Sequence, residues 1–229
     1  MKKSILSFVL GVVTFVAIAQ NPGPELLDPT NHSLLLIDHE GQMAFATHSI
    51  SATELRSNVA LVAGASKIFN VPTVVTTVAE KSFSGPVFPE IQEFYPESTS
   101  GYIDRTTMNT WEDVNAHKAI TGKGKKKIVM AGLWTSVCIV GPVLSAIDEG
   151  YDIYVITDAS GDVTKEAHDQ AVTRMVQAGA KPMTSLQYLL ELQRDWARQE
   201  TYQAVNDLVV KYGGAYGIGV QYAREMLKK

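Results

Sequence analysis

Cysteine is scarce in this sequence: Cys138 is the only one among 229 residues. A disulfide within the chain is therefore impossible, and a small fold stapled by disulfide bridges is excluded. Charge of one sign is not in excess either, because the net charge is −4 and charged residues make up 19% of the chain. The dense cationic run KGKKK at 123–127 directly precedes a strand-like segment and is expected to be a solvated loop, so we expect no nucleic-acid partner.

The histidines do not have the spacing of a metal site. The five histidines are His32, His39, His48, His117 and His168. We therefore predict no bound metal and no other cofactor.

The first residues differ from the rest. Two lysines precede an apolar segment at 4–18, and the small-x-small pattern AIA occupies 17–19. This predicts a secretory signal peptide at residues 1–19, cleaved between Ala19 and Gln20, and hence a periplasmic or secreted protein. An uncleaved anchor is the alternative, although the segment is short of the ~20 residues that a spanning helix needs. After cleavage we expect no membrane association.

Short apolar runs rich in β-branched residues alternate with helical patterns after residue 30. Strands are predicted at 33–38, 71–78, 101–105, 126–133, 151–160 and 181–184, and helices at 54–69, 111–119, 138–150, 164–178, 185–210 and from 220 onward. Strand–helix alternation repeated about five times predicts a doubly wound, mainly parallel sheet of about five to six strands with helices on both faces.

The remaining segments are predicted from their Gly, Pro and polar content. Residues 39–50 are expected to be a loop, and 79–108 a long structured loop of the kind that is usually functional. The globular domain is predicted at 30–200, followed by a C-terminal helical extension at 201–229. The extension is rich in aromatic residues, which is consistent with a subunit contact and equally with packing on its own domain.

Three polar residues should meet at one edge of the predicted sheet: Asp38 at the end of the first strand, Cys138 after the strand at 126–133, and Arg105 from the long loop before that strand. Open α/β sheets bind ligands at the carboxyl ends of their strands. Acyl transfer by a thiol needs a base, a cation that favours the thiolate, and N–H donors for the oxyanion. The start of a helix also favours a thiolate. The alternative is that Cys138 is buried and acts only as a small apolar side chain.

Six segments of the sequence resemble those of a known protein family. In order along the chain, LLLIDHEGQM, TTV, YIDR, NTW, AGLWTSVC and LSAIDEGYDIYVITDASG resemble the isochorismatase-like cysteine hydrolase family, and within it the YcaC-type branch. The resemblance covers about residues 30–200. It implies a three-layer α/β/α sandwich, a small-molecule substrate and, often, assembly into a homo-oligomer.

The resemblance also assigns site residues. It implies a catalytic triad of Asp38, Arg105 and Cys138, where most members have lysine in place of the arginine. It further implies a non-proline cis peptide at Leu133–Trp134 that directs the Trp134 and Cys138 amides at the oxyanion. Arginine stays protonated and cannot transfer a proton during the reaction, so we expect Arg105 to have an electrostatic role. The zinc ligands of the nicotinamidase branch are absent from this sequence.

Further residues are predicted to line the pocket. They are His39, Thr77, Glu80, Phe83, Asn109 and Trp111. For Glu80, a solvated loop carboxylate is a nearly equal alternative. We expect His39 to form the pocket wall or support it instead of acting as the general base.

The function predicted from these residues is hydrolysis of a small amide C–N bond through a thioester, with aspartate as base and cysteine as nucleophile. One alternative is a vinyl-ether hydrolase of the isochorismatase type, in which the cysteine is not needed as nucleophile. Another is a non-enzymatic oligomeric protein with a redox-sensitive thiol.

Overall fold

A computed structural model describes residues 22–228 of the chain, so the predicted signal peptide at 1–19 lies outside the described residues and stays a prediction. Six strands form one sheet in the order β3-β2-β1-β4-β5-β6, and every neighbouring pair is parallel. The strands are β1 (His32–Ile37), β2 (Thr73–Val78), β3 (Ile103–Arg105), β4 (Lys127–Gly132), β5 (Asp152–Ile156) and β6 (Lys181–Met183). The predicted doubly wound parallel sheet is confirmed.

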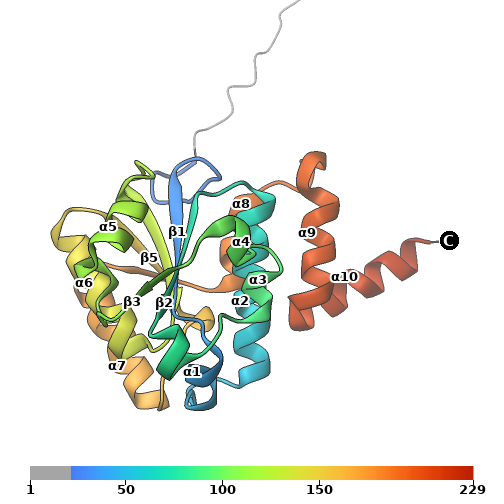
Figure 1. Ribbon diagram of the computed structural model, residues 1–229. Helices are drawn as coiled ribbons and strands as arrows, with labels where there is room; N and C mark the ends of the chain where they lie inside the picture. The colour runs from blue at the N-terminus through green and yellow to red at the C-terminus, as the bar shows by residue number, and fades with distance from the viewer. Residues whose placement is uncertain (1–21, 229) are drawn as a thin grey trace, which may run out of the picture.

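Helices cover both faces of this sheet, giving three layers (Figure 1). One face carries α5 (Val114–Thr121), α6 (Val140–Asp148) and α7 (Lys165–Gln177). The opposite face carries α2 (Ala52–Ile68) and α8 (Ser185–Gln193). The predicted three-layer sandwich is thus confirmed.

The central strand β1 divides the apolar core into two clusters. Leu34 and Leu36 pack with residues of α2 and α8, whereas Leu35 and Ile37 pack with residues of α5, α6 and α7. Successive side chains of a strand point to opposite faces, so a strand buried on both faces is apolar throughout. This pattern fixes the register of β1 and thereby the place where the chain leaves the sheet.

Two segments differ from the sequence-based prediction. Residues 39–50, expected to be a loop, contain the short helix α1 (Gly41–Phe45), and α2 is capped by Ser51, whose hydroxyl accepts from the Glu54 amide. The long segment 79–108 is folded into short turns of helix. They are η1 (Glu80–Ser84), α3 (Pro89–Gln92) and α4 (Glu97–Ser100), followed by β3, and η2 (Thr110–Glu112) comes directly after the segment.

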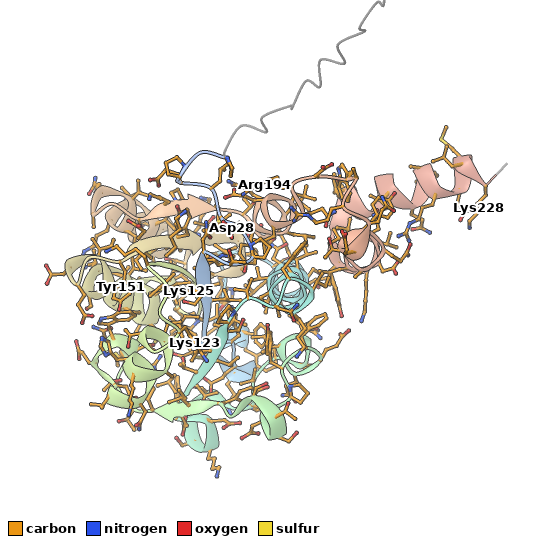
Figure 2. All side chains as sticks on the ribbon, turned by 90° about the horizontal axis from the view of Figure 1, so that it is seen from above. Asp28, Lys123, Lys125, Tyr151, Arg194 and Lys228 are labelled. Carbon is orange, nitrogen blue, oxygen red and sulfur yellow. The ribbon has the colours of Figure 1, made fainter. Side chains whose placement is uncertain are left out.

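The C-terminal part also departs from the prediction of one helix over 185–210. The chain turns at Arg194, whose φ of 55° is incompatible with a continuing helix, and resumes as α9 (Gln199–Tyr212) and α10 (Gly214–Leu227). Helix α9 packs on α2, and α10 extends away from the body (Figures 1 and 2). Within residues 22–228 no helix has the length and apolar character that a membrane span requires.

Candidate active site

The site lies where the order of the strands reverses, between β1 and β4. Asp38 directly follows β1, Arg105 ends β3, and Cys138 lies in η3 (Thr135–Ile139), which joins β4 to α6. All three therefore come from the carboxyl-terminal edge of the sheet, the edge at which ligands bind in open α/β folds. The fold therefore brings Asp38, Arg105 and Cys138 to the same edge of the sheet, as expected.

Asp38 occupies an unusual backbone conformation. Its φ is 55°, in the left-handed region, which aspartate tolerates better than most residues. Its amide still donates to the Thr76 carbonyl over 3.1 Å, as if β1 continued, and its Oδ1 accepts from the Thr76 hydroxyl over 3.2 Å. The turn therefore begins at Asp38 itself, and β2 holds the carboxyl group in place.

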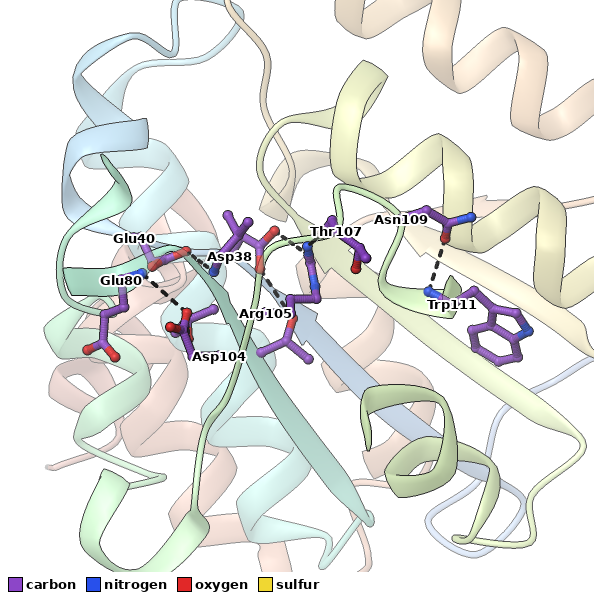
Figure 3. Close-up of polar contacts among 11 residues, drawn as sticks. Asp38, Glu40, Glu80, Asp104, Arg105, Thr107, Asn109 and Trp111 are labelled. Carbon is purple, nitrogen blue, oxygen red and sulfur yellow. Dashed lines mark hydrogen bonds and ion pairs between the residues drawn. The ribbon is translucent and has the colours of Figure 1, made fainter. Parts of the chain in front are cut away.

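Arg105 is paired with Asp38 inside the protein. Its Nη2 donates to Asp38 Oδ2 over 2.5 Å, and both side chains are fully buried. Its Nη1 donates to the carbonyl of Thr107, and both contacts are visible in Figure 3. The Arg105 Nε is buried and has no partner within residues 22–228. The guanidinium is thus fixed by the carboxylate on one side and by its own loop on the other.

Cys138 completes the group. The residue is 3% exposed, and both the Asp38 carboxyl and the Arg105 guanidinium lie close enough to act on the pKa of its thiol. Burial, and secondly the Asp38 charge, raises the pKa of Cys138 to about 12. Burial also raises the pKa of Asp38 to about 6, against the opposing charge of Arg105. At neutral pH the proton of the pair is therefore on sulfur and the carboxylate is free to accept it.

This result corrects the expectation that the surroundings of Cys138 favour a thiolate. The sulfur is too deeply buried for the guanidinium to offset the loss of water, and the adjacent carboxylate opposes a second negative charge. The resting site is therefore a thiol next to a base.

The turn before the cysteine has the expected cis peptide at Leu133–Trp134. The Trp134 N–H has no acceptor among residues 22–228, whereas the Cys138 N–H donates to the Trp134 carbonyl over 2.8 Å. Of the two amides predicted as oxyanion donors, only that of Trp134 is free in this structure.

Two aromatic side chains lie at the turn that leads to Cys138. The indole Nε1 of Trp134 donates to the Met43 carbonyl over 3.1 Å and to the Thr47 hydroxyl over 3.0 Å, which fixes the ring. The ring of Phe83 meets it edge to face with centroids 6.5 Å apart, and Phe83 is 62% exposed. The predicted pocket residue Phe83 is thus placed beside the turn that leads to the cysteine.

Other predicted pocket residues are engaged elsewhere. His39 is buried, donates from Nε2 to the Ala159 carbonyl over 2.8 Å, and has its pKa lowered to about 4 by burial. It is a neutral ring that ties the loop after β1 to the segment after β5. The Thr77 hydroxyl and the Glu80 amide both donate to Asp104 Oδ1, over 3.0 and 3.2 Å. These two contacts shape the start of η1.

Asn109 and Trp111 make packing and capping contacts. The Asn109 Oδ1 accepts from the Trp111 amide over 3.0 Å, and its Nδ2 donates to the Ser145 hydroxyl over 3.1 Å. The Trp111 ring meets the rings of His117 and Tyr151 edge to face, in the same apolar cluster as Cys138. Both residues, predicted to line the pocket, serve to anchor η2 on α6.

Three residues of the site were missed by the sequence analysis: Thr76, Thr107 and Glu40. Thr76 is the register partner of Ile37, and Thr107 supplies a backbone oxygen, so neither carries a signal before the fold is known. Glu40 did carry a signal, since it is a charged residue two positions after Asp38. The structure shows that it is 0% exposed. Among the described residues, no three His, Cys, Asp or Glu side chains are grouped to hold a metal ion.

The sequence matches a known family and its members. Residues 32–187 match the isochorismatase domain family. The probable hydrolase YcaC of Escherichia coli K12 is 37% identical over 171 residues, which cover 74% of this chain and 81% of that protein.

Solved structures give the same result. E. coli YcaC, described as an octameric hydrolase of unknown specificity, superposes with a TM-score of 0.82 at 33% identity, covering 91% of this chain and 100% of that one. YcaC from Pseudomonas aeruginosa with hexane-2,5-diol and covalent acrylamide superposes with a TM-score of 0.81 at 33% identity, covering 88% and 98%. This chain belongs to the isochorismatase family and is a YcaC-like hydrolase.

Proposed function

We propose that this protein hydrolyses the C–N bond of a small amide, with Cys138 as nucleophile and Asp38 as general base. The observation that carries the proposal is that Cys138 is buried close enough to Asp38 for the carboxylate, itself paired with Arg105, to act on the pKa of the thiol. A thiol is activated as a nucleophile when an adjacent base can take its proton. The pKa values of about 6 and about 12 give the two groups opposite protonation states at neutral pH.

The reaction starts with transfer of the thiol proton to Asp38 as sulfur attacks the amide carbonyl carbon. The free N–H of Trp134 is the donor available to the developing oxyanion. Collapse of the tetrahedral intermediate breaks the C–N bond, and Asp38 returns the proton to the leaving amine. Water then attacks the thioester, Asp38 again moves the proton, and acid and free thiol are released.

Arg105 acts by its charge. It opposes the effect of burial on the pKa of Asp38, so the carboxyl is mostly ionised at pH 7 although it is inaccessible to solvent. Arginine keeps its proton throughout the pH range of proteins, so no step passes a proton through it.

The known reaction of thiols with acrylamide supports Cys138 as the nucleophile. Acrylamide is an electrophile that adds to nucleophilic thiols, and the P. aeruginosa YcaC structure contains covalent acrylamide. Acrylamide is also a small primary amide, which makes it a fitting probe of Cys138 in this chain.

The test is an ammonia-release screen over small primary amides, acetamide to benzamide, with Cys138→Ala as the blank. The proposal predicts release that C138A abolishes and Asp38→Asn reduces at least about a hundredfold, the range of general acid–base catalysis. Turnover of a vinyl ether that survives in C138A would instead establish isochorismatase-type hydrolysis. No hydrolysis of any substrate, together with reversible oxidation of Cys138, would establish the redox protein.

We further propose that the chain forms a homo-oligomer through α10. This helix exposes Ile218, Tyr222, Met226 and Leu227, which are 56%, 67%, 71% and 83% exposed in the single chain. The octameric E. coli relative supports assembly. Light scattering of the full chain is expected to give a multiple of the protomer mass, and the double variant Ile218→Glu, Tyr222→Glu a smaller one. Lys123→Glu, on the surface loop before β4, is the control.

A further inference from the structure

Glu40 is a buried acid that the reaction above does not use. It lies two residues after Asp38, at the start of α1, and is 0% exposed. Its Oε2 accepts from the Val78 amide over 2.9 Å. Val78 ends β2 and is the register partner of Arg105. The Glu40 side chain thus connects the loop that carries Asp38 with the strand end beside Arg105 (Figure 3).

The second oxygen of Glu40 has no partner. Oε1 is buried and no group within residues 22–228 donates to it. A carboxylate oxygen without a donor or water is costly to bury, and far more so with its charge. A protonated carboxyl removes that charge while Oε2 still accepts from Val78.

The charges around Glu40 also oppose its ionisation. The carboxyl groups whose charges act on it are the buried Asp38 after β1, the exposed Asp104 of β3 and the partly exposed Glu80 of η1. The nearby cation, Arg105, is engaged by Asp38 and by the Thr107 carbonyl. The neighbouring His39 is neutral. Burial first, and then these three carboxylates, raises the pKa of Glu40 to about 8, against the Val78 N–H, which favours the charged form.

We propose that Glu40 is a positioning residue: as a protonated carboxyl it fastens the loop carrying Asp38 to the end of β2 beside Arg105, and its ionisation releases that loop. The proposal rests on the proposed function for its effect on catalysis only. Above about pH 8, Glu40 gains a charge that is buried beside the Asp38 carboxylate with Oε1 unpaired, so the loop loosens and Asp38 leaves its place next to Cys138.

The first test compares hydrogen exchange of the segment 34–43 in the wild type and in Glu40→Gln at pH 6.5 and pH 9. Glutamine keeps the shape and the acceptor for Val78 and carries no charge. Equal exchange is expected at pH 6.5, and at pH 9 exchange at least about threefold faster in the wild type. Glu166→Gln, an exposed carboxyl on α7, is the matched control and should behave as the wild type. Equal exchange of wild type and E40Q at both pH values would overturn the proposal.

The second test measures the urea midpoint of unfolding between pH 5.5 and 8.5. A folded-state pKa of about 8, against an ordinary value of 4.5, means that the folded protein holds more protons, so its stability falls as pH rises across this range. E40Q lacks this loss, and its midpoint should exceed that of the wild type increasingly with pH. A difference that does not change with pH would contradict a buried protonated Glu40.

Activity provides the third test. The kcat/KM of an amide substrate should fall above about pH 8 in the wild type and stay level to pH 9 in E40Q. Glu40→Ala, which leaves the Val78 amide unpaired, should lose activity at all pH values, whereas E40Q retains it. Loss in E40Q equal to that in E40A would show that Glu40 acts through its charge or its proton transfer. Hydrogen exchange and urea unfolding need no substrate. They therefore test the role of Glu40 even if the protein hydrolyses no amide.

Discussion

The guanidinium of Arg105 donates to the carboxylate of Asp38 over 2.5 Å, and neither side chain is exposed. The two residues are 67 positions apart and are joined only because β3 and β1 end at the same edge of the sheet. Such a buried pair is costly to break, since the remaining charge would be left in the core without water or partner. The pair therefore fixes both the position and the charge of the base.

Arg105→Ala is expected to lower the free energy of unfolding by about 3–5 kcal/mol, because Asp38 loses its buried partner. Arg105→Lys keeps the charge but cannot contact both Asp38 and the Thr107 carbonyl in the same way, so a smaller loss is expected. Urea unfolding at pH 7 measures both. Lys123→Ala on the surface is the control, and an R105A protein as stable as this control would contradict the buried pair.

His39→Gln tests whether the histidine next to Asp38 takes part in proton transfer. The glutamine amide can still donate to the Ala159 carbonyl, so hydrolysis and its dependence on pH should be retained. Because the pKa of His39 is lowered to about 4, the wild type loses stability as pH falls from 6.5 to 4, and H39Q should lose less. A large loss of activity at pH 7 with intact stability would instead make His39 the base.

Gly132→Ala should strongly destabilise the fold where β1 and β4 meet below the site. A Cβ at this position would collide with the Ile37 carbonyl oxygen and approach Ile139 Cδ1 and Ile37 Cβ at 2.7 and 2.8 Å. The backbone oxygen cannot move, because it accepts from the Leu133 amide. We expect a loss of more than about 2 kcal/mol in urea unfolding, as for overpacked cores.

The matched control is Gly219→Ala on α10, where nothing lies within 4 Å of the added Cβ. Alanine in a helix interior is favoured over glycine by about 0.5–1 kcal/mol, so this variant should be as stable as the wild type or more so. If G132A were equally stable, the close approach of the two strands would be refuted.

The sheet could be predicted from the sequence because its strands are buried on both faces. The continuous apolar run at 34–37 is typical of such a strand, and the helix predicted at 164–178 begins with Thr164, whose hydroxyl accepts from the Ala167 amide. The break at Arg194 could not be predicted, because no glycine or proline marks it; the residue has a positive φ, and its guanidinium donates to the carbonyl of Leu27, far away in the sequence.

The site was predicted in part for a similar reason. Asp38, Arg105 and Cys138 meet because strand ends meet, which alternation alone implies. The roles of Asn109 and Trp111 depend on packing between η2 and α6, which no local pattern specifies. The protonation of Cys138 depends on depth of burial, which outweighs the guanidinium charge and cannot be read from residue types.

The most direct test of the central claim is the pH profile of Cys138 alkylation by iodoacetamide between pH 5 and 8, in the wild type and in Asp38→Asn. If Asp38 takes the thiol proton, the wild-type rate rises through about pH 6, where Asp38 ionises, and is then constant to pH 8. In D38N the thiol loses its proton to solvent alone, and the rate should rise about tenfold per pH unit over the whole range. A wild-type rate that also rises about tenfold per unit, with no break near pH 6, would contradict the account.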